Sequence, residues 1–190
     1  GGNNKQEAAK PFIVEKGGLK LAIVNMAENE FIGATDHTPG FHGYDPVNVF
    51  YELAALKKIA DKILVIFHGG HEHYSYPSPD MQKRYRYMID AGADVVIAHH
   101  THVYSGYEHY KNGFIAYSLG NFIFDKPGKR NEGWNYGMAI WLRFTPKGEF
   151  SFELHPYMQC NDSAQVIFLE DKPAFLESIR DINAIIADRE

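Results

Sequence analysis

The sequence has few of the features that identify several common classes of protein. It contains one cysteine, Cys160, in 190 residues, so no internal disulfide can form and a disulfide scaffold is excluded. No stretch approaches the roughly 20 consecutive apolar residues of a membrane-spanning helix, and no basic segment followed by an apolar run marks a signal peptide. Because the net charge is -5, we expect no nucleic-acid partner held by a basic face.

Motifs for nucleotide binding and covalent catalysis are also missing. The sequence has no Walker loop, no Gly-x-Gly-x-x-Gly turn and no Gly-x-Ser-x-Gly nucleophile elbow. Its single cysteine is far in sequence from the residues considered below. Covalent catalysis is therefore disfavoured, and water activated by a metal ion is the better hypothesis.

The composition, with 45% hydrophobic residues, is that of a chain with a folded core rather than a disordered chain. Strands are expected over 19–25, 63–67, 94–98, 114–118, 137–144, 150–156 and 165–169, and helices over 46–60, 78–91 and 173–189. Residues 28–45 are expected to form a long loop. The strand–helix–strand order from 63 to 98 predicts a parallel pair joined by a right-handed crossover.

Histidine is the conspicuous residue, and seven of the ten histidines lie between positions 68 and 109. One cluster, His68-Gly-Gly-His-Glu72, follows the apolar strand 63–67; the other, His99-His-Thr-His102, follows the strand 94–98. Ligands gather at the carboxyl ends of strands in open α/β sheets. We therefore expect both clusters to lie at the same edge of one sheet.

His68, His100 and His102 are the candidate metal ligands. Two residues apart in extended backbone, His100 and His102 would project to the same side, and imidazole suits Zn, Mn, Fe or Ni. Gly69 and Gly70 would allow a sharp turn after His68. The alternative is that these are ordinary turn or surface histidines, and His71 and His73 fit that alternative better than a ligand role.

Two further side chains are candidates for catalysis. Glu72 could accept a hydrogen bond from a ligand histidine or transfer a proton, although a solvated loop carboxylate is an equal alternative. Asn121 follows the turn at Gly120, and Asp125 follows soon after. Either could position water or phosphate, but from chemistry alone a role in capping the turn is favoured.

These motifs, in this order, resemble the CapA-type bacterial capsule-synthesis proteins, also called poly-γ-glutamate biosynthesis proteins. The resemblance rests on 68–72, Pro79, 92–103 and 117–125, and it extends from residue 3 to about 152. It implies a calcineurin-like metallophosphoesterase sandwich with α-β-β-α layers. Carried over by position, His68, His100 and His102 match metal ligands and Glu72 matches the family's glutamate. Gly69 and Thr101 depart from a common aromatic residue and a common proline, and neither change removes a ligand.

The resemblance also implies what is missing. Calcineurin-like sites take an Asp-x-His pair, a bridging Asp and an Asn-His motif from the first half of the domain, and none occurs upstream of Gly17. We therefore interpret residues 1–190 as a single partial domain, the second half, present as a natural fragment or a truncated chain. Its expected partners are the missing half, a second copy of itself covering the exposed sheet, and an anionic polymer or phosphoester substrate.

The resemblance predicts two divalent ions (Mn, Fe or Zn) in the intact domain, where activated water attacks a phosphate ester. The chain alone, with few anionic ligands, is expected to be inactive and to bind metal weakly or not at all. A bacterial envelope or extracytoplasmic location is implied, with no anchor or signal in this sequence. Two alternatives are a non-catalytic polymer-binding or export component that keeps the fold, and an unrelated histidine-rich hydrolase.

Overall fold

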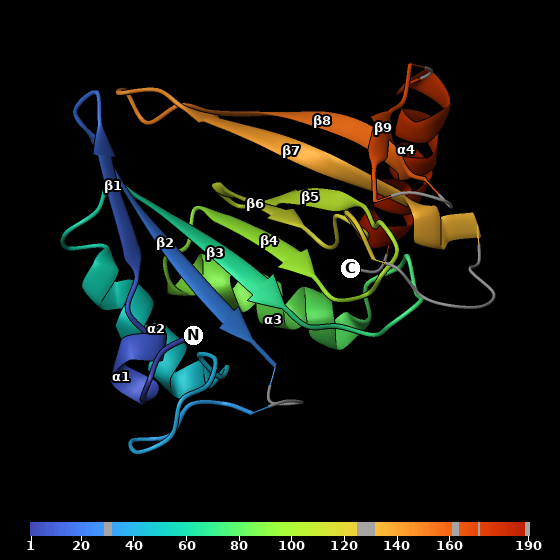
Figure 1. Ribbon diagram of the computed structural model, residues 1–190. Helices are drawn as coiled ribbons and strands as arrows, with labels where there is room; N and C mark the ends of the chain where they lie inside the picture. The colour runs from blue at the N-terminus through green and yellow to red at the C-terminus, as the bar shows by residue number, and fades with distance from the viewer. Residues whose placement is uncertain (29–31, 125–131, 161–163, 171, 189–190) are drawn as a thin grey trace.

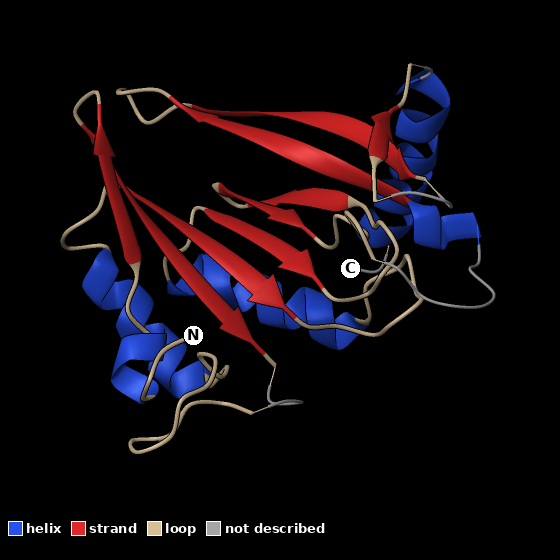
Figure 2. Cartoon of the chain, in the orientation of Figure 1, coloured by secondary structure: helices blue, strands red, loops and turns tan. Residues whose placement is uncertain are grey.

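Two β-sheets pack face to face, and helices cover the outer face of the larger one (Figures 1 and 2). The structure is a computed structural model that describes residues 1–28, 32–124, 132–160, 164–170 and 172–188. The layers are therefore helix, sheet and sheet, which are three of the four layers of the predicted α-β-β-α sandwich.

The larger sheet has six strands in the order β1-β2-β3-β4-β6-β5. In chain order these are β1 (Phe12–Lys16), β2 (Leu19–Ala27), β3 (Lys62–His68), β4 (Val95–His99), β5 (Tyr107–Tyr110) and β6 (Gly113–Ala116). Strands β2, β3, β4 and β6 are parallel, whereas β1 and β5 run antiparallel at the two edges. The predicted parallel crossover unit between 63 and 98 is confirmed.

Helices α2 (Pro46–Leu56) and α3 (Pro79–Ala91) cover one face of this sheet. Their apolar residues form one core with alternate residues of β2 and β3: Ala22, Val24, Met26, Ile63, Val65 and Phe67. Both ends of α3 are capped, since the Ser78 hydroxyl accepts the Met81 N–H at 3.3 Å and Gly92 ends the helix at φ 132°. A third, four-residue helix, α1 (Lys5–Ala8), precedes β1.

The smaller sheet is antiparallel, in the order β7-β8-β9, and packs on the other face. It consists of β7 (Tyr136–Phe144), β8 (Phe150–Gln159) and β9 (Val166–Phe168), preceded by a 3-10 turn, η1 (Glu132–Asn135). Apolar residues of β7 and β8, such as Ile140 and Phe152, pack on Val95, Ile97 and Phe114. This second core joins the two sheets.

The C-terminal helix α4 (Lys172–Ala187) lies against the edge strand β5 and closes the side of the sandwich. One side of the helix is buried: Phe175, Ile179, Ile182 and Ile186. Asn183 fixes the contact, because its side-chain oxygen accepts the backbone N–H of Tyr107 at 2.7 Å. The helix therefore packs at an edge of the larger sheet, beside β5.

Two edge strands and one helix end differ from the sequence prediction. Strand β1 was not predicted; it forms a hairpin with β2 through Gly17 and Gly18, whose φ values of 61° and 78° suit a two-residue turn. Strand β5 was also missed, because Tyr107–Tyr110 lacks an apolar alternation. Helix α2 ends at Leu56, four residues before the predicted end.

Candidate metal centre

The two histidine clusters lie together at the carboxyl ends of β3 and β4. His68 and His99 are directly in register in the parallel ladder, and the Gly69 N–H donates to the His99 carbonyl oxygen at 3.0 Å just beyond it. Further out, the His73 N–H donates to the Thr101 carbonyl oxygen at 2.7 Å. The prediction that both clusters share one sheet edge is confirmed.

Glu72, His100 and His102 present ligand atoms that all lie within 4.8 Å of one another. The Nε2 atom of His102 is 3.6 Å from Oε1 of Glu72, which is longer than a hydrogen bond. Two ligands held about 2.1 Å from one tetrahedral ion would be roughly 3.4 Å apart. Two imidazoles and a carboxylate at this separation fit a divalent ion.

The fourth candidate, His68, lies beside this group rather than within it. Its ring centroid is 4.8 Å from that of His100, and its side chain is exposed. His73 also approaches the group, with Nε2 3.6 Å from a Glu72 oxygen and its ring stacked 6.0 Å from that of His102. His71, in contrast, is an exposed loop residue.

Three histidines at this edge have positive φ values, which are uncommon for residues other than glycine. The values are 66° for His73, 107° for His100 and 62° for His102. The expectation that His100 and His102 sit in extended backbone is therefore wrong; the strained turn brings their rings to 5.9 Å instead. Backbone strain of this kind costs about 1–3 kcal/mol per residue and concentrates at functional sites.

Thr101, between the two histidines, anchors the strained turn in the protein interior. It is 1% exposed, and its hydroxyl lies 2.8 Å from both the Val103 carbonyl oxygen and Oγ of Ser118. Because Ser118 follows β6, the turn is fastened to a neighbouring strand end. These contacts hold the backbone in a conformation that the local sequence alone would not favour.

Asn121 sets the orientation of the His102 ring. Its Oδ1 lies 2.8 Å from Nδ1 of His102, and its amide donates to the carbonyl oxygens of His102 and Trp134. With the amide so placed, Oδ1 is the acceptor, so Nδ1 carries a proton and Nε2 is the ring nitrogen available to a metal ion on the side of Glu72. Trp134 stacks on the same ring at 4.8 Å, and Phe124 meets it edge-on.

The remaining histidine of the second cluster, His99, is held in its neutral form. Burial lowers the pKa of His99, and the neighbouring His68 lowers it further. Its place in β4, on the face toward the smaller sheet, follows from its register with His68. Asp125, the other residue considered for positioning water, lies outside the described residues.

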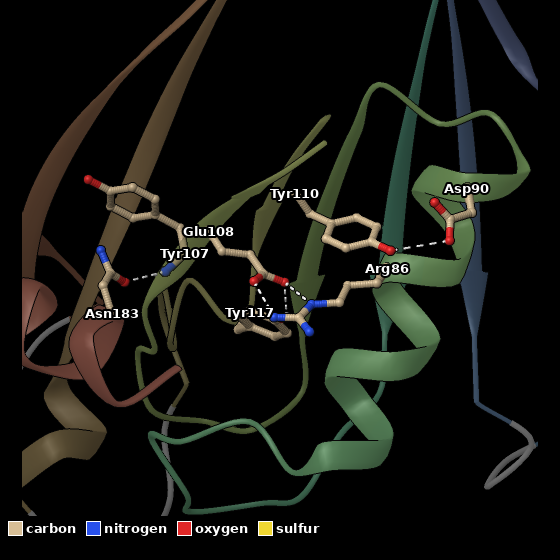
Figure 3. Close-up of polar contacts among 7 residues, drawn as sticks. All are labelled: Arg86, Asp90, Tyr107, Glu108, Tyr110, Tyr117 and Asn183. Carbon is tan, nitrogen blue, oxygen red and sulfur yellow. Dashed lines mark hydrogen bonds and ion pairs between the residues drawn. The ribbon is translucent and has the colours of Figure 1, made fainter. Parts of the chain in front are cut away.

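A buried network of polar side chains supports the turn after His68. The Tyr85 hydroxyl donates to the Gly69 carbonyl oxygen at 3.1 Å, and the Tyr85 ring stacks on that of Tyr117 at 5.7 Å. The Tyr117 hydroxyl in turn donates to Glu108 at 2.5 Å (Figure 3). Burial and the hydrogen bond to Glu108 both raise the pKa of Tyr117, so the phenol stays protonated.

Arg86 completes this network with a bidentate ion pair to Glu108. Its Nε and one terminal nitrogen donate to the two oxygens of Glu108 at 2.9 and 2.7 Å (Figure 3). Both side chains are largely buried, with 18% and 13% of their surfaces exposed. Sequence reasoning missed this pair, because a helix residue and an edge-strand residue 22 positions apart carry no shared local signal.

The fold places the chain in a known structural class. The structure resembles a novel phosphatase from Mycoplasma pneumoniae with a TM-score of 0.50 and 14% sequence identity, over 88% of this chain and 59% of that one. The likeness concerns the fold alone, which is a metallophosphoesterase-like α/β sandwich.

Sequence comparison supplies the family. Residues 1–126 match the model of the bacterial capsule synthesis protein PGA_cap, and the chain belongs to that family. It is 33% identical over 158 residues to a PGA biosynthesis protein CapA of Bacillus subtilis (strain 168), and 32% identical over 137 residues to a capsule biosynthesis protein CapA of Bacillus anthracis. These matches cover 82% and 69% of this chain.

The chain spans 41% and 33% of the lengths of these two relatives. Strands β7 to β9 and helix α4 lie beyond the residues matched by the family model. Among the described residues, no helix is long and apolar enough to cross a membrane.

Proposed function

We propose that this chain is the histidine-bearing half of a metal-dependent phosphoesterase that acts in bacterial capsule or poly-γ-glutamate biosynthesis. The observation that supports it most is the group of Glu72, His100 and His102, with ligand atoms within 4.8 Å at the carboxyl edge of a parallel sheet. Family membership supports the biosynthetic setting, and the fold of the phosphatase neighbour supports the reaction class.

Four side chains would hold metal in this proposal: His100, His102, Glu72 and His68. From the sequence, Glu72 was a candidate for accepting a hydrogen bond from a ligand histidine or for proton transfer; its carboxylate oxygen lies 3.6 Å from Nε2 of His102, a separation that two ligands of one ion would have. A bound divalent ion would supply activated water near neutral pH and positive charge for a phosphate group. Asn121 would act as a positioning residue, because it fixes the tautomer and orientation of His102.

The aromatic residues around His102 would limit access of bulk water to one side of the centre. Trp134 is 3% exposed and stacks on the ring, whereas Phe124 is 44% exposed and borders the opening. A drier environment strengthens the interaction between a metal centre and an anionic substrate. The arrangement suits a phosphoester or another anionic group approaching from the sheet edge.

The partners and location are part of the proposal. The centre would be completed by acidic ligands from polypeptide outside these 190 residues in a longer protein, giving a dinuclear site. The complete protein would work at the bacterial envelope on an anionic polymer or phosphoester. The chain alone should show little turnover, because a single carboxylate in the group offsets little of the charge of two ions.

Metal titration followed by calorimetry tests the centre directly. We expect Mn²⁺ or Zn²⁺ to bind, and His102→Ala to weaken binding at least tenfold, because a ligand is lost. Asn121→Ala should weaken it roughly 10–100-fold without removing a ligand. His37→Ala is the matched control, since this exposed histidine lies outside the group and should leave affinity unchanged. Equal affinity in all four proteins would refute the centre.

A phosphodiester assay on the complete gene product then tests the reaction. Turnover that requires metal and disappears with His100→Ala supports the phosphoesterase. Metal binding without any turnover would instead favour a second candidate, an envelope component that binds or exports polymer. The observation favouring that candidate is the single carboxylate in the group. Robust turnover by the 190-residue chain alone would contradict the idea that it is half of a site.

A further inference from the structure

A surface pocket lies between helices α2 and α3, which contact each other on the outer side of the larger sheet (Figure 1). Its volume is about 360 Å³, near the small end of the range for pockets that bind small ligands. None of the candidate metal ligands lines it. Its walls come from α3, from the start of α2 and from the loop before α2: Tyr44, Pro46, Asp80, Lys83, Arg84 and Tyr87.

The pocket follows the outer side of α3. Four of its residues share one face of the helix, because they are three or four positions apart: Asp80, Lys83, Arg84 and Tyr87. The residues that α3 packs on the sheet, among them Met81 and Tyr85, lie on another face. The Tyr87 hydroxyl donates to the Pro46 carbonyl oxygen at 2.6 Å and ties this side of α3 to the start of α2.

Two adjacent cations, Lys83 and Arg84, dominate the chemistry of the pocket. Lys83 is exposed and forms no ion pair with any residue that the structure describes. Arg84 uses one terminal nitrogen, Nη1, in an ion pair with Glu28, and its Cζ lies 5.2 Å from the centroid of the Tyr44 ring. Because a guanidinium has five N–H donors, Arg84 retains donors for a ligand.

The other side chains of the pocket suit the uncharged parts of a ligand. Tyr44, Pro46 and Tyr87 contribute rings against which apolar carbon can pack. Burial raises the pKa of Tyr44 to about 12, so its phenol stays neutral and adds no negative charge beside the cations. Asp80 is exposed in the first turn of α3 and can accept an N–H group. The pocket therefore matches a molecule with carboxylates, amide N–H groups and methylene groups.

Arg84 also connects this pocket with the histidine edge. Glu28, its ion-pair partner, accepts the Gly70 N–H at 3.0 Å with its carboxylate. The backbone N–H of Glu28 donates to the carbonyl oxygen of the candidate ligand His68 at 2.9 Å. One glutamate thus holds both sides of the turn after His68. A ligand bound to Arg84 is separated from that turn only by Glu28.

We propose that this pocket binds one unit of an amide-linked chain that carries a carboxylate on every unit. The carboxylate pairs with Lys83 and with the remaining N–H groups of Arg84. The amide N–H donates to Asp80, and the methylene groups pack on the rings of Tyr44 and Tyr87. Poly-γ-glutamate is such a chain, and the idea rests on the proposed function only for the identity of the polymer. The pocket holds the polymer beside the histidine edge, and this binding requires no metal.

The balance of charges favours this ligand over a phosphate group. Asp80 and Glu28 lie close to the two cations, so the local positive charge is largely offset. A doubly charged phosphate would be repelled by Asp80 and would offer it no N–H donor. An amide-linked carboxylate chain offers that donor and only one negative charge per unit.

Binding of a γ-linked glutamate pentamer to the 190-residue chain in EDTA, measured by NMR and calorimetry, tests the proposal. The backbone amide signals of Lys83, Arg84 and Gly70 should shift on titration. Lys83→Glu should weaken binding roughly fivefold or more, because an attraction becomes a repulsion. Lys58→Glu is the matched control, since this exposed lysine beyond the end of α2 lies outside the pocket and should change affinity less than roughly twofold.

The proposal would be overturned if these amide signals did not shift, or if Lys83→Glu and Lys58→Glu bound the pentamer equally. Tripolyphosphate is the second probe. If it binds as tightly as the pentamer and is weakened equally by Lys83→Glu, the pocket is a general anion site and the proposed ligand class is wrong. Because EDTA removes metal, failure here leaves the metal titration untouched, and failure of that titration leaves polymer binding untouched.

Discussion

The buried ion pair between Arg86 and Glu108 gives the sharpest test of how the site is supported. Replacing Glu108 with Leu removes both hydrogen bonds to the guanidinium and the acceptor of the Tyr117 hydroxyl at once. Arg86 is 18% exposed, so water cannot fully solvate the charge that loses its counterion. We therefore expect the replacement of this one residue in the edge strand β5 to cause a large loss of stability.

The magnitude follows from the burial of the pair. Breaking a buried ion pair by removing one partner costs about 3–5 kcal/mol, because the other charge is left in a poorly solvated place. For a domain of this size each kcal/mol lowers Tm by roughly 2–4 °C. Glu108→Leu should thus lower Tm by roughly 6–20 °C.

Urea unfolding followed by circular dichroism measures the change in free energy. The control is Glu153→Leu, which removes the carboxylate of an exposed pair with Arg143 and should cost less than about 1 kcal/mol. The double variant Arg86→Met, Glu108→Leu removes both charges and should be more stable than Glu108→Leu alone. The reasoning would be refuted if Glu108→Leu lowered the free energy of unfolding as little as Glu153→Leu does. A double variant less stable than Glu108→Leu would refute it as well.

Three smaller predictions concern the tyrosines and the cap of α3. Tyr85→Phe should cost about 1 kcal/mol through the lost bond to Gly69 and weaken metal binding. Tyr87→Phe, a half-buried residue of the same helix whose hydroxyl donates to the Pro46 carbonyl oxygen, should leave metal binding unchanged in calorimetry. Burial raises the pKa of Tyr157 to about 12. The neutral phenol therefore stabilises the fold fully below about pH 10, and this contribution is lost between pH 10 and 12. In unfolding experiments, Tyr157→Phe should reduce the fall in the free energy of unfolding over this pH range. Ser78→Ala should cost about 0.5–1 kcal/mol in urea unfolding, and no change would mean that the hydroxyl does not cap the helix.

Much of the framework was predictable because its signals are local. The apolar run 63–67 indicates a doubly buried strand, and Ser78 and Gly92 mark the ends of α3 by side-chain and backbone chemistry within a few residues. Parallel strands joined by one crossover must end at the same sheet edge, so the meeting of His68 with His99 also followed from the order of elements. Periodicity and topology were sufficient for these features.

The sequence alone therefore determined all the strands except β1 and β5, and the edge at which the histidines gather. Only the tertiary structure decided how the histidines face one another, because the left-handed turn at His100 is held by Thr101 and Ser118, from different strand ends. It likewise decided the placement of Glu72 and the pairing of Arg86 with Glu108. Such contacts join residues distant in sequence, and local propensity cannot specify them, because their energy exists only once the sheet has formed.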